Sequence, residues 1–111
     1  MIHMLVPALA AAAGAPYAPP PELWYHQAVA CAASAMVDKG AAPTGDQVGE
    51  LMTWGLILAD EAPRAGRTRA QADSGDLERA EAFYRRLKDR KPEAFAAHRA
   101  YCRAVIEAER S

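Results

Sequence analysis

The stretch at residues 21–40, PELWYHQAVACAASAMVDKG, has the longest helical pattern in the chain and carries Cys31 near its middle. Apolar residues recur along it at steps of three and four, in the rows Trp24, Ala28, Cys31, Ala35 and Tyr25, Val29, Ala32, Met36. This spacing predicts a helix with a wide apolar face, against which the rest of the chain packs. Proline at its start and Gly40 after its last turn are typical of the two ends of a helix.

The second of the two cysteines, Cys102, lies near the middle of the last helical pattern, which Pro92 opens and which runs to about residue 110. Its apolar face consists of Phe95, His98, Cys102, Val105 and Ile106. Two further helical patterns lie between the cysteines, so we predict an all-α, up-and-down four-helix bundle. In that topology the first and last helices are antiparallel neighbours. Cys31 then faces Cys102 in a disulfide, and Ala35 faces His98.

The second helix is predicted from a capping box at Thr44 and Gln47 to Pro63. Its apolar face consists of Val48, Leu51, Met52, Gly55, Leu58, Ala59 and Ala62, widened by Trp54 and Ile57. Gly49 and Gly55 each weaken a helix by about 1 kcal/mol relative to alanine. We therefore expect another backbone or a bulky ring, such as that of Trp24, to approach them closely.

Residues 63–74 have no apolar periodicity beyond alanine and predict a solvated loop with room for one helical turn. Asp73 or Ser74 then caps a third helix. Its narrow core stripe consists of Leu77, Ala80, Tyr84 and Leu87. This helix ends at Lys91, because the residue before a proline is pushed out of the helical region.

Residues 1–20 contain no charged side chain, are rich in alanine and end in a proline cluster. This composition favours a secretory signal, with an apolar region at residues 4–13 and a mature chain that begins between residues 14 and 17. Against it, the start has no lysine or arginine, and Pro7 interrupts the apolar run. A disordered Ala/Pro-rich tail on a cytosolic protein is the alternative. Either way, a single helical domain follows at residues 21–111.

Composition excludes several classes of protein. The 111 residues suffice for one domain. The sequence contains no run of eighteen apolar residues that could span a membrane. A formal net charge of −1 gives no general attraction to nucleic acid. We therefore expect no nucleic-acid partner and no membrane span in the mature chain.

The two cysteines have three possible states. A bridge across about 70 residues would stabilise the fold by about 4 kcal/mol and, like the signal-like leader, indicates a periplasmic or secreted protein. In a cytosolic bundle both would be buried thiols. A metal site on Cys31, His98 and Cys102 would lack a fourth ligand, and the sequence has no C-x-x-C motif. We expect the disulfide, with no metal and no cofactor.

Catalysis finds little support in the sequence. There is no nucleophile elbow, no P-loop and no G-x-G-x-x-G motif. The adjacent acids Asp60 and Glu61 do not face each other on a helix. We therefore expect both to be solvated and to take no part in acid–base catalysis. We expect no catalytic residue and no enzyme.

Cys31 in a first helix, Trp54 in a second and Cys102 in a last helix form a layout that resembles small periplasmic helical immunity proteins, which neutralise secreted cell-wall amidases. At the same coarse level the layout is similar to periplasmic acid-stress chaperones with one bridge. The resemblance covers these three residues and the fold class, and it carries over no functional residue. It implies function by surface contact with other proteins, as an inhibitor of the immunity-protein type or the chaperone type.

The third helix carries the candidate binding residues on one side, which is separate from the side that carries its core stripe: Arg79, Phe83, Arg86 and Arg90. An exposed aromatic among guanidinium groups is a mixture that protein interfaces favour, so this face predicts the docking of an acidic partner protein. The alternative is that the basic residues complement the helix dipole while Phe83 covers a gap in the core. We therefore expect an exported helical protein that acts by protein binding; a cytosolic regulatory or structural bundle is the alternative.

Overall fold

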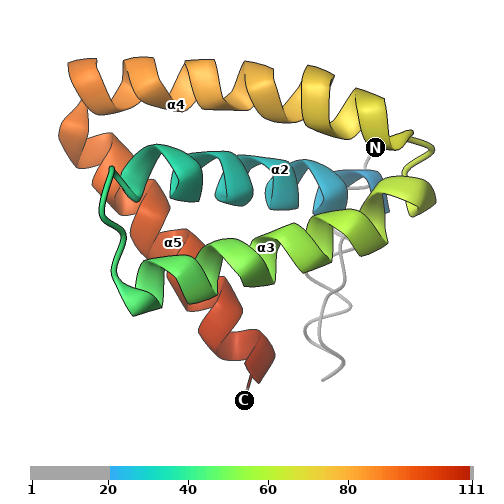
Figure 1. Ribbon diagram of the computed structural model, residues 1–111, viewed down its shortest axis with the longest axis horizontal. Helices are drawn as coiled ribbons and strands as arrows, with labels where there is room; N and C mark the ends of the chain where they lie inside the picture. Colours follow the sequence, from blue (N-terminus) through green and yellow to red (C-terminus); the bar gives the residue numbers. More distant parts are fainter. Residues whose placement is uncertain (1–20, 111) are drawn as a thin grey trace, which may run out of the picture.

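The computed structural model describes residues 21–110, and the leader predicted at residues 1–20 lies outside the described residues. The elements are α2 (Pro21–Asp38), α3 (Gly45–Arg64), the π-helical segment η1 (Gln71–Leu77) that runs into α4 (Glu78–Arg90), and α5 (Pro92–Arg110). Consecutive helices alternate in direction (Figure 1). The predicted all-α four-helix bundle is therefore confirmed, and residues 21–110 contain no strand.

Helix α2 is the centre of the molecule. It lies between α3 and α4, and α5 crosses behind it (Figure 1). Its middle is buried almost all the way round, at Ala28, Val29, Cys31, Ala32, Ala33, Ser34 and Ala35. A helix that is apolar on every side is buried on every side, and its small side chains let the neighbouring helices approach closely.

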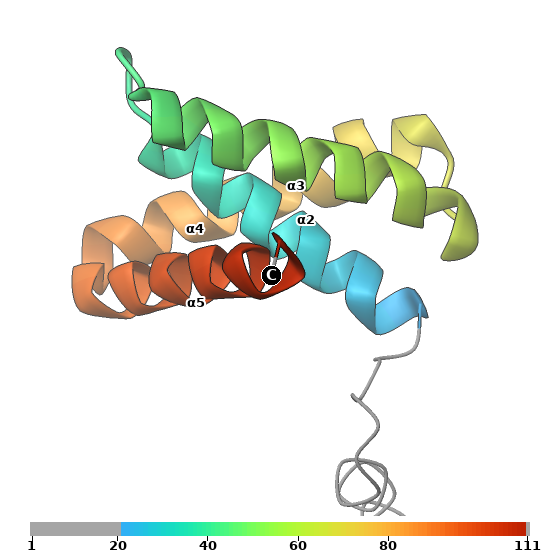
Figure 2. The same cartoon turned by 90° about the horizontal axis from the view of Figure 1, so that it is seen from below.

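The predicted disulfide joins α2 to α5. Cys31 and Cys102 are both fully buried, and their Cα atoms lie 5.6 Å apart. The expected register fails away from the bridge, because α5 crosses α2 obliquely and does not lie alongside it (Figure 2). His98 accordingly meets the carbonyl of Ala30 at 3.5 Å, not Ala35. Oblique crossings are the commonest way in which helices of globular proteins pack, and a sequence pattern does not choose between crossing angles.

The loop predicted at residues 63–74 is wrong at both ends. Pro63 lies inside the last turn of α3, which ends at Arg64, and Gly66 follows with a φ of 74° that suits a residue without a side chain. A second capping box then starts the next helix at residue 69: the amide of Gln71 donates to the Thr68 hydroxyl at 3.1 Å, and the Thr68 amide donates to the Gln71 side chain at 2.8 Å. Only residues 65–68 separate the two helices.

No helix in the described part of the chain is long and apolar enough to cross a membrane.

Candidate functional site

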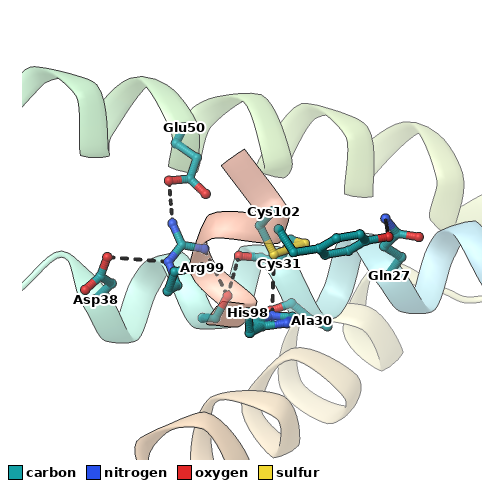
Figure 3. Close-up of a disulfide and its surroundings, with 10 residues drawn as sticks. Gln27, Ala30, Cys31, Asp38, Glu50, His98, Arg99 and Cys102 are labelled. Carbon is teal, nitrogen blue, oxygen red and sulfur yellow. Dashed lines mark hydrogen bonds and ion pairs between the residues drawn. A yellow bond between two sulfur atoms is a disulfide. The ribbon is translucent and has the colours of Figure 1, made fainter. Parts of the chain in front are cut away.

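A buried arginine connects three helices beside the disulfide (Figure 3). Arg99 of α5 is only 3 % exposed. Its guanidinium donates to the Ser34 hydroxyl at 3.0 Å and to an Asp38 carboxylate oxygen at 3.4 Å, both on α2. It also donates to Glu50 of α3, which is buried as well. This Arg99 cluster holds α5, α2 and α3 together, and its one hydroxyl, that of Ser34, donates to the Cys31 carbonyl at 3.1 Å.

The Arg99 cluster contains two carboxylates, those of Asp38 and Glu50, and one guanidinium. Asp38 is partly solvated, with 31 % of its side chain exposed, but Glu50 is not. One oxygen of Glu50, Oε2, has no hydrogen-bond partner among the described residues. The guanidinium of Arg99 therefore offsets the free-energy cost of burying the Glu50 carboxylate, because a buried carboxylate without a counter-charge is strongly unfavourable.

A second polar cluster connects α2 to the start of α4 through Asp76. The fully buried Tyr25 donates its hydroxyl to Asp76 at 2.7 Å. Arg67 makes a bidentate pair with the same carboxylate at 2.9 and 3.0 Å, and Arg79 donates at 2.5 Å. Burial, and then the adjacent Asp76 carboxylate, raise the pKa of Tyr25 to about 12. Burial also favours protonation of Asp76, but its hydrogen bonds with Tyr25 and Arg67 outweigh that effect and lower its pKa.

Replacing Asp76 with asparagine should destabilise the protein by about 2 kcal/mol at neutral pH, because a buried hydroxyl and a guanidinium lose their charged acceptor. The loss should depend on pH. The pKa of Asp76 is depressed in the folded chain, so ionised Asp76 adds stability that is complete above the unfolded pKa and is lost as the pH falls through the folded pKa. Urea denaturation between neutral pH and about pH 2 should show the two proteins converging. A gap that does not narrow in acid would contradict this role.

His98 is a half-buried histidine beside the disulfide, at the edge of the core. Its Nε2 is 3.4 Å from the Cys102 sulfur, and Tyr84 stacks on its ring at 4.6 Å. Burial lowers the pKa of His98, and the Ala30 carbonyl opposes that effect. The ligand atoms of Cys31, His98 and Cys102 all lie within 4.8 Å of one another. In the bridged state, however, the two sulfurs are bonded to each other and are not thiolate ligands.

The predicted binding residues on α4 divide into two groups. Arg79 turns to Asp76 and belongs to the polar cluster just described. Phe83 is 50 % exposed and packs edge-on against Tyr84. A shallow hollow of about 350 Å³ is lined by Phe83, Arg86, Leu87, Arg90 and Lys91, and we name it the α4 hollow. The cations that line it, Arg86, Arg90 and Lys91, form no ion pair within residues 21–110.

The sequence interpretation missed Arg99, Glu50 and Asp76, although two of them carry a signal. Phe95, Arg99, Cys102 and Ile106 follow one another at steps of four, three and four, which places Arg99 on the buried stripe of α5. Glu50 has the same relation to Trp54 and Leu58 on α3. A charged residue at a core position of two facing helices could have indicated a buried pair.

No family model, curated protein or solved structure matches the chain significantly.

Proposed function

We propose that the protein is an exported helical protein that acts by binding a partner protein, and that the α4 hollow docks an acidic segment of that partner. The observation that carries this proposal is the combination of a half-exposed Phe83 ring with Arg86, Arg90 and Lys91 around one concavity. The ring offers an apolar anchor. The three cations would find their first counter-charges on the partner.

Charge and shape both select an acidic, amphipathic partner segment. Aromatic and arginine side chains carry much of the binding free energy in interfaces, because they combine large apolar area with directed hydrogen bonds. Unpaired cations at the rim speed the encounter with an acidic surface and disfavour a basic one. Arg79 contributes less than the sequence predicts, since Asp76 already neutralises it. An inhibitor of the immunity-protein type or the chaperone type would work through such a surface.

Export is supported by the Cys31–Cys102 bridge, because disulfides persist in the periplasm and outside the cell and are rare in the cytosol. The signal-like composition of residues 1–20 supports the same compartment. A cytosolic regulatory bundle, the competing proposal, would keep both cysteines as thiols.

The α4 hollow should bind a fluorescent amphipathic peptide that alternates glutamates with leucines. Phe83→Asp combined with Arg86→Glu should weaken this binding at least about tenfold, because the variant loses the apolar anchor and reverses one charge. Helicity and melting temperature should stay near those of the wild type, since both side chains are exposed. Fluorescence anisotropy at low and high salt measures the change, and salt should weaken the wild-type complex.

A control lies on α5, where Tyr101→Asp combined with Arg103→Glu also replaces an exposed aromatic and an exposed arginine with acids, away from the hollow. It additionally removes the hydrogen bond that Gln27 donates to the Tyr101 hydroxyl. This control should bind like the wild type. Equal loss in both double variants would mean that net charge alone attracts the peptide. Unfolding of the α4 variant would mean that Phe83 belongs to the core, and both outcomes would contradict the proposal.

A further inference from the structure

Helix α3 differs from an ordinary surface helix on both of its sides, although Trp54 and Leu58 face the core as usual. It buries Glu50 and Glu61, which are 9 % and 8 % exposed, whereas Met52 and Leu56 are 64 % and 71 % exposed. The sequence predicts the opposite for Glu61, as part of a solvated pair. Scattered apolar residues on a surface are ordinary, but buried acids on one side of a helix and large apolar side chains on the other are not.

The outward side of α3 has no charged or polar side chain. It consists of Gly45, Val48, Gly49, Met52, Gly55, Leu56, Ala59 and Pro63. Beside it runs a mostly apolar groove of about 510 Å³, formed by α3 together with Met36 of α2 and Leu77 of η1. Arg69 and Asp73 also line this groove and pair with each other at 3.5 Å. We call the outward side and this groove together the α3 face. The α3 face is thus a projecting apolar ridge next to a mostly apolar hollow.

Two glycines on this ridge lack an explanation inside the molecule. The expected close approach to Gly49 and Gly55 is wrong: nothing lies within 4 Å of the position that a Cβ would occupy at either residue. Trp24 instead packs against Trp54, with ring centroids 6.2 Å apart. A glycine inside a helix is less stable than alanine, and its use is to let another backbone come close. Within the described residues, no such backbone approaches Gly55.

We propose that a second copy of this chain covers the α3 face and forms a two-fold dimer. In a two-fold interface each residue near the axis meets its own counterpart, so an unpaired charge there would repel itself. The ridge has no charged side chain, and the two charged residues that line the groove, Arg69 and Asp73, pair with each other. Ridge and groove lie side by side, which lets Leu56 of each copy enter the groove of the other. A different partner would normally be selected by unpaired charges, as on α4, and the α3 face offers none.

The size of the α3 face fits this occupant. A helix of 20 residues is about 30 Å long, and the ridge with its groove is about two helix diameters, ~20 Å, across. The face therefore offers about 600 Å² in projection, which approaches the roughly 800 Å² that each partner buries in a stable interface. The α3 face shares no residue with the α4 hollow, so this proposal stands or falls independently of the proposed function.

Sedimentation equilibrium of the full oxidised chain across the micromolar range tests the dimer. The wild type should fit a monomer–dimer equilibrium. Leu56→Glu should raise the dissociation constant at least about thirtyfold, because it places a charge in the apolar centre of the interface. Phe83→Glu, an equally drastic change at an exposed position of α4, should leave the dimer intact. If Leu56→Glu loses helicity, Met52→Glu takes its place, since it is also exposed.

Gly55→Ala gives a second readout, with opposite signs for the monomer and the dimer. In the monomer the added methyl meets open space, so the melting temperature of the dilute protein should rise. In the dimer the methyl separates the two helices, so the dissociation constant should rise as well. A wild type that stays monomeric throughout would overturn the proposal. A dimer that survives both α3 variants, or that Gly55→Ala does not weaken, would overturn it too.

Discussion

Arg99→Met should destabilise the protein by about 3–5 kcal/mol, a large share of the roughly 5–15 kcal/mol that holds a small domain together. Arg99 is 3 % exposed and compensates the buried carboxylate of Glu50. Without it, Glu50 is an isolated buried charge, and the Ser34 hydroxyl loses a donor. Urea denaturation of the oxidised proteins at neutral pH gives the difference in the free energy of unfolding.

The double variant Arg99→Met, Glu50→Leu should recover most of this loss. It replaces a buried ion pair with apolar side chains of similar size, which in other proteins is neutral or even stabilising. Asp38 can remain, because its carboxylate reaches solvent. Arg103→Met, at an exposed position of the same helix, is the control and should change stability by less than about 0.5 kcal/mol. A double variant no better than Arg99→Met would mean that Glu50 does not depend on Arg99.

Cys102→Ser should cost about 4 kcal/mol, since the bridge to Cys31 closes a loop with a sequence separation of 71 residues. The bridge restricts the unfolded chain, and it also fixes the point at which α5 crosses α2. Chemical reduction of the wild type is the matched control, because it breaks the bridge without changing the sequence. Reduced wild type and the variant should therefore unfold at similar urea concentrations.

A loss below about 1 kcal/mol in both proteins would mean that packing holds α5 in place and that the bridge contributes little.

The end of α2 and the start of α3 were predictable because local chemistry decides them, and the bridge was predictable because both cysteines lie near the middle of helical patterns. Thr44 and Gln47 form the capping box that their spacing indicates, and Gly40 has the positive φ of a left-handed stop. The missed helix start at Thr68 has the same spacing, with Gln71 three residues later. Its signal was present, but the surrounding arginines and alanines resemble a solvated loop.

The orientation of α3 was not predictable, because apolar side chains occur on more than one side of it. Trp54 and Leu58 face the core, whereas Met52 and Leu56, at the same spacing, face solvent. Only the Arg99 guanidinium on another helix makes Glu50 acceptable inside, and a helical period cannot show such a tertiary partner.

The binding residues on α4 share this limit. Helical spacing places Phe83, Arg86 and Arg90 around one hollow. It could not show that Arg79 is engaged by Asp76, because that pair joins the π-helical segment η1 to the first turn of α4.

The most direct test of this account is the intact mass of protein purified from its source cells without reductant, unfolded and treated with a thiol-alkylating reagent. The Cys31–Cys102 bridge joins α2 to α5 covalently, and the proposed export would keep it oxidised. We therefore expect a chain with no alkylated cysteine, and with both cysteines alkylated once reductant is added. A chain that carries two alkyl groups without reductant would contradict both the bridge and the proposed export.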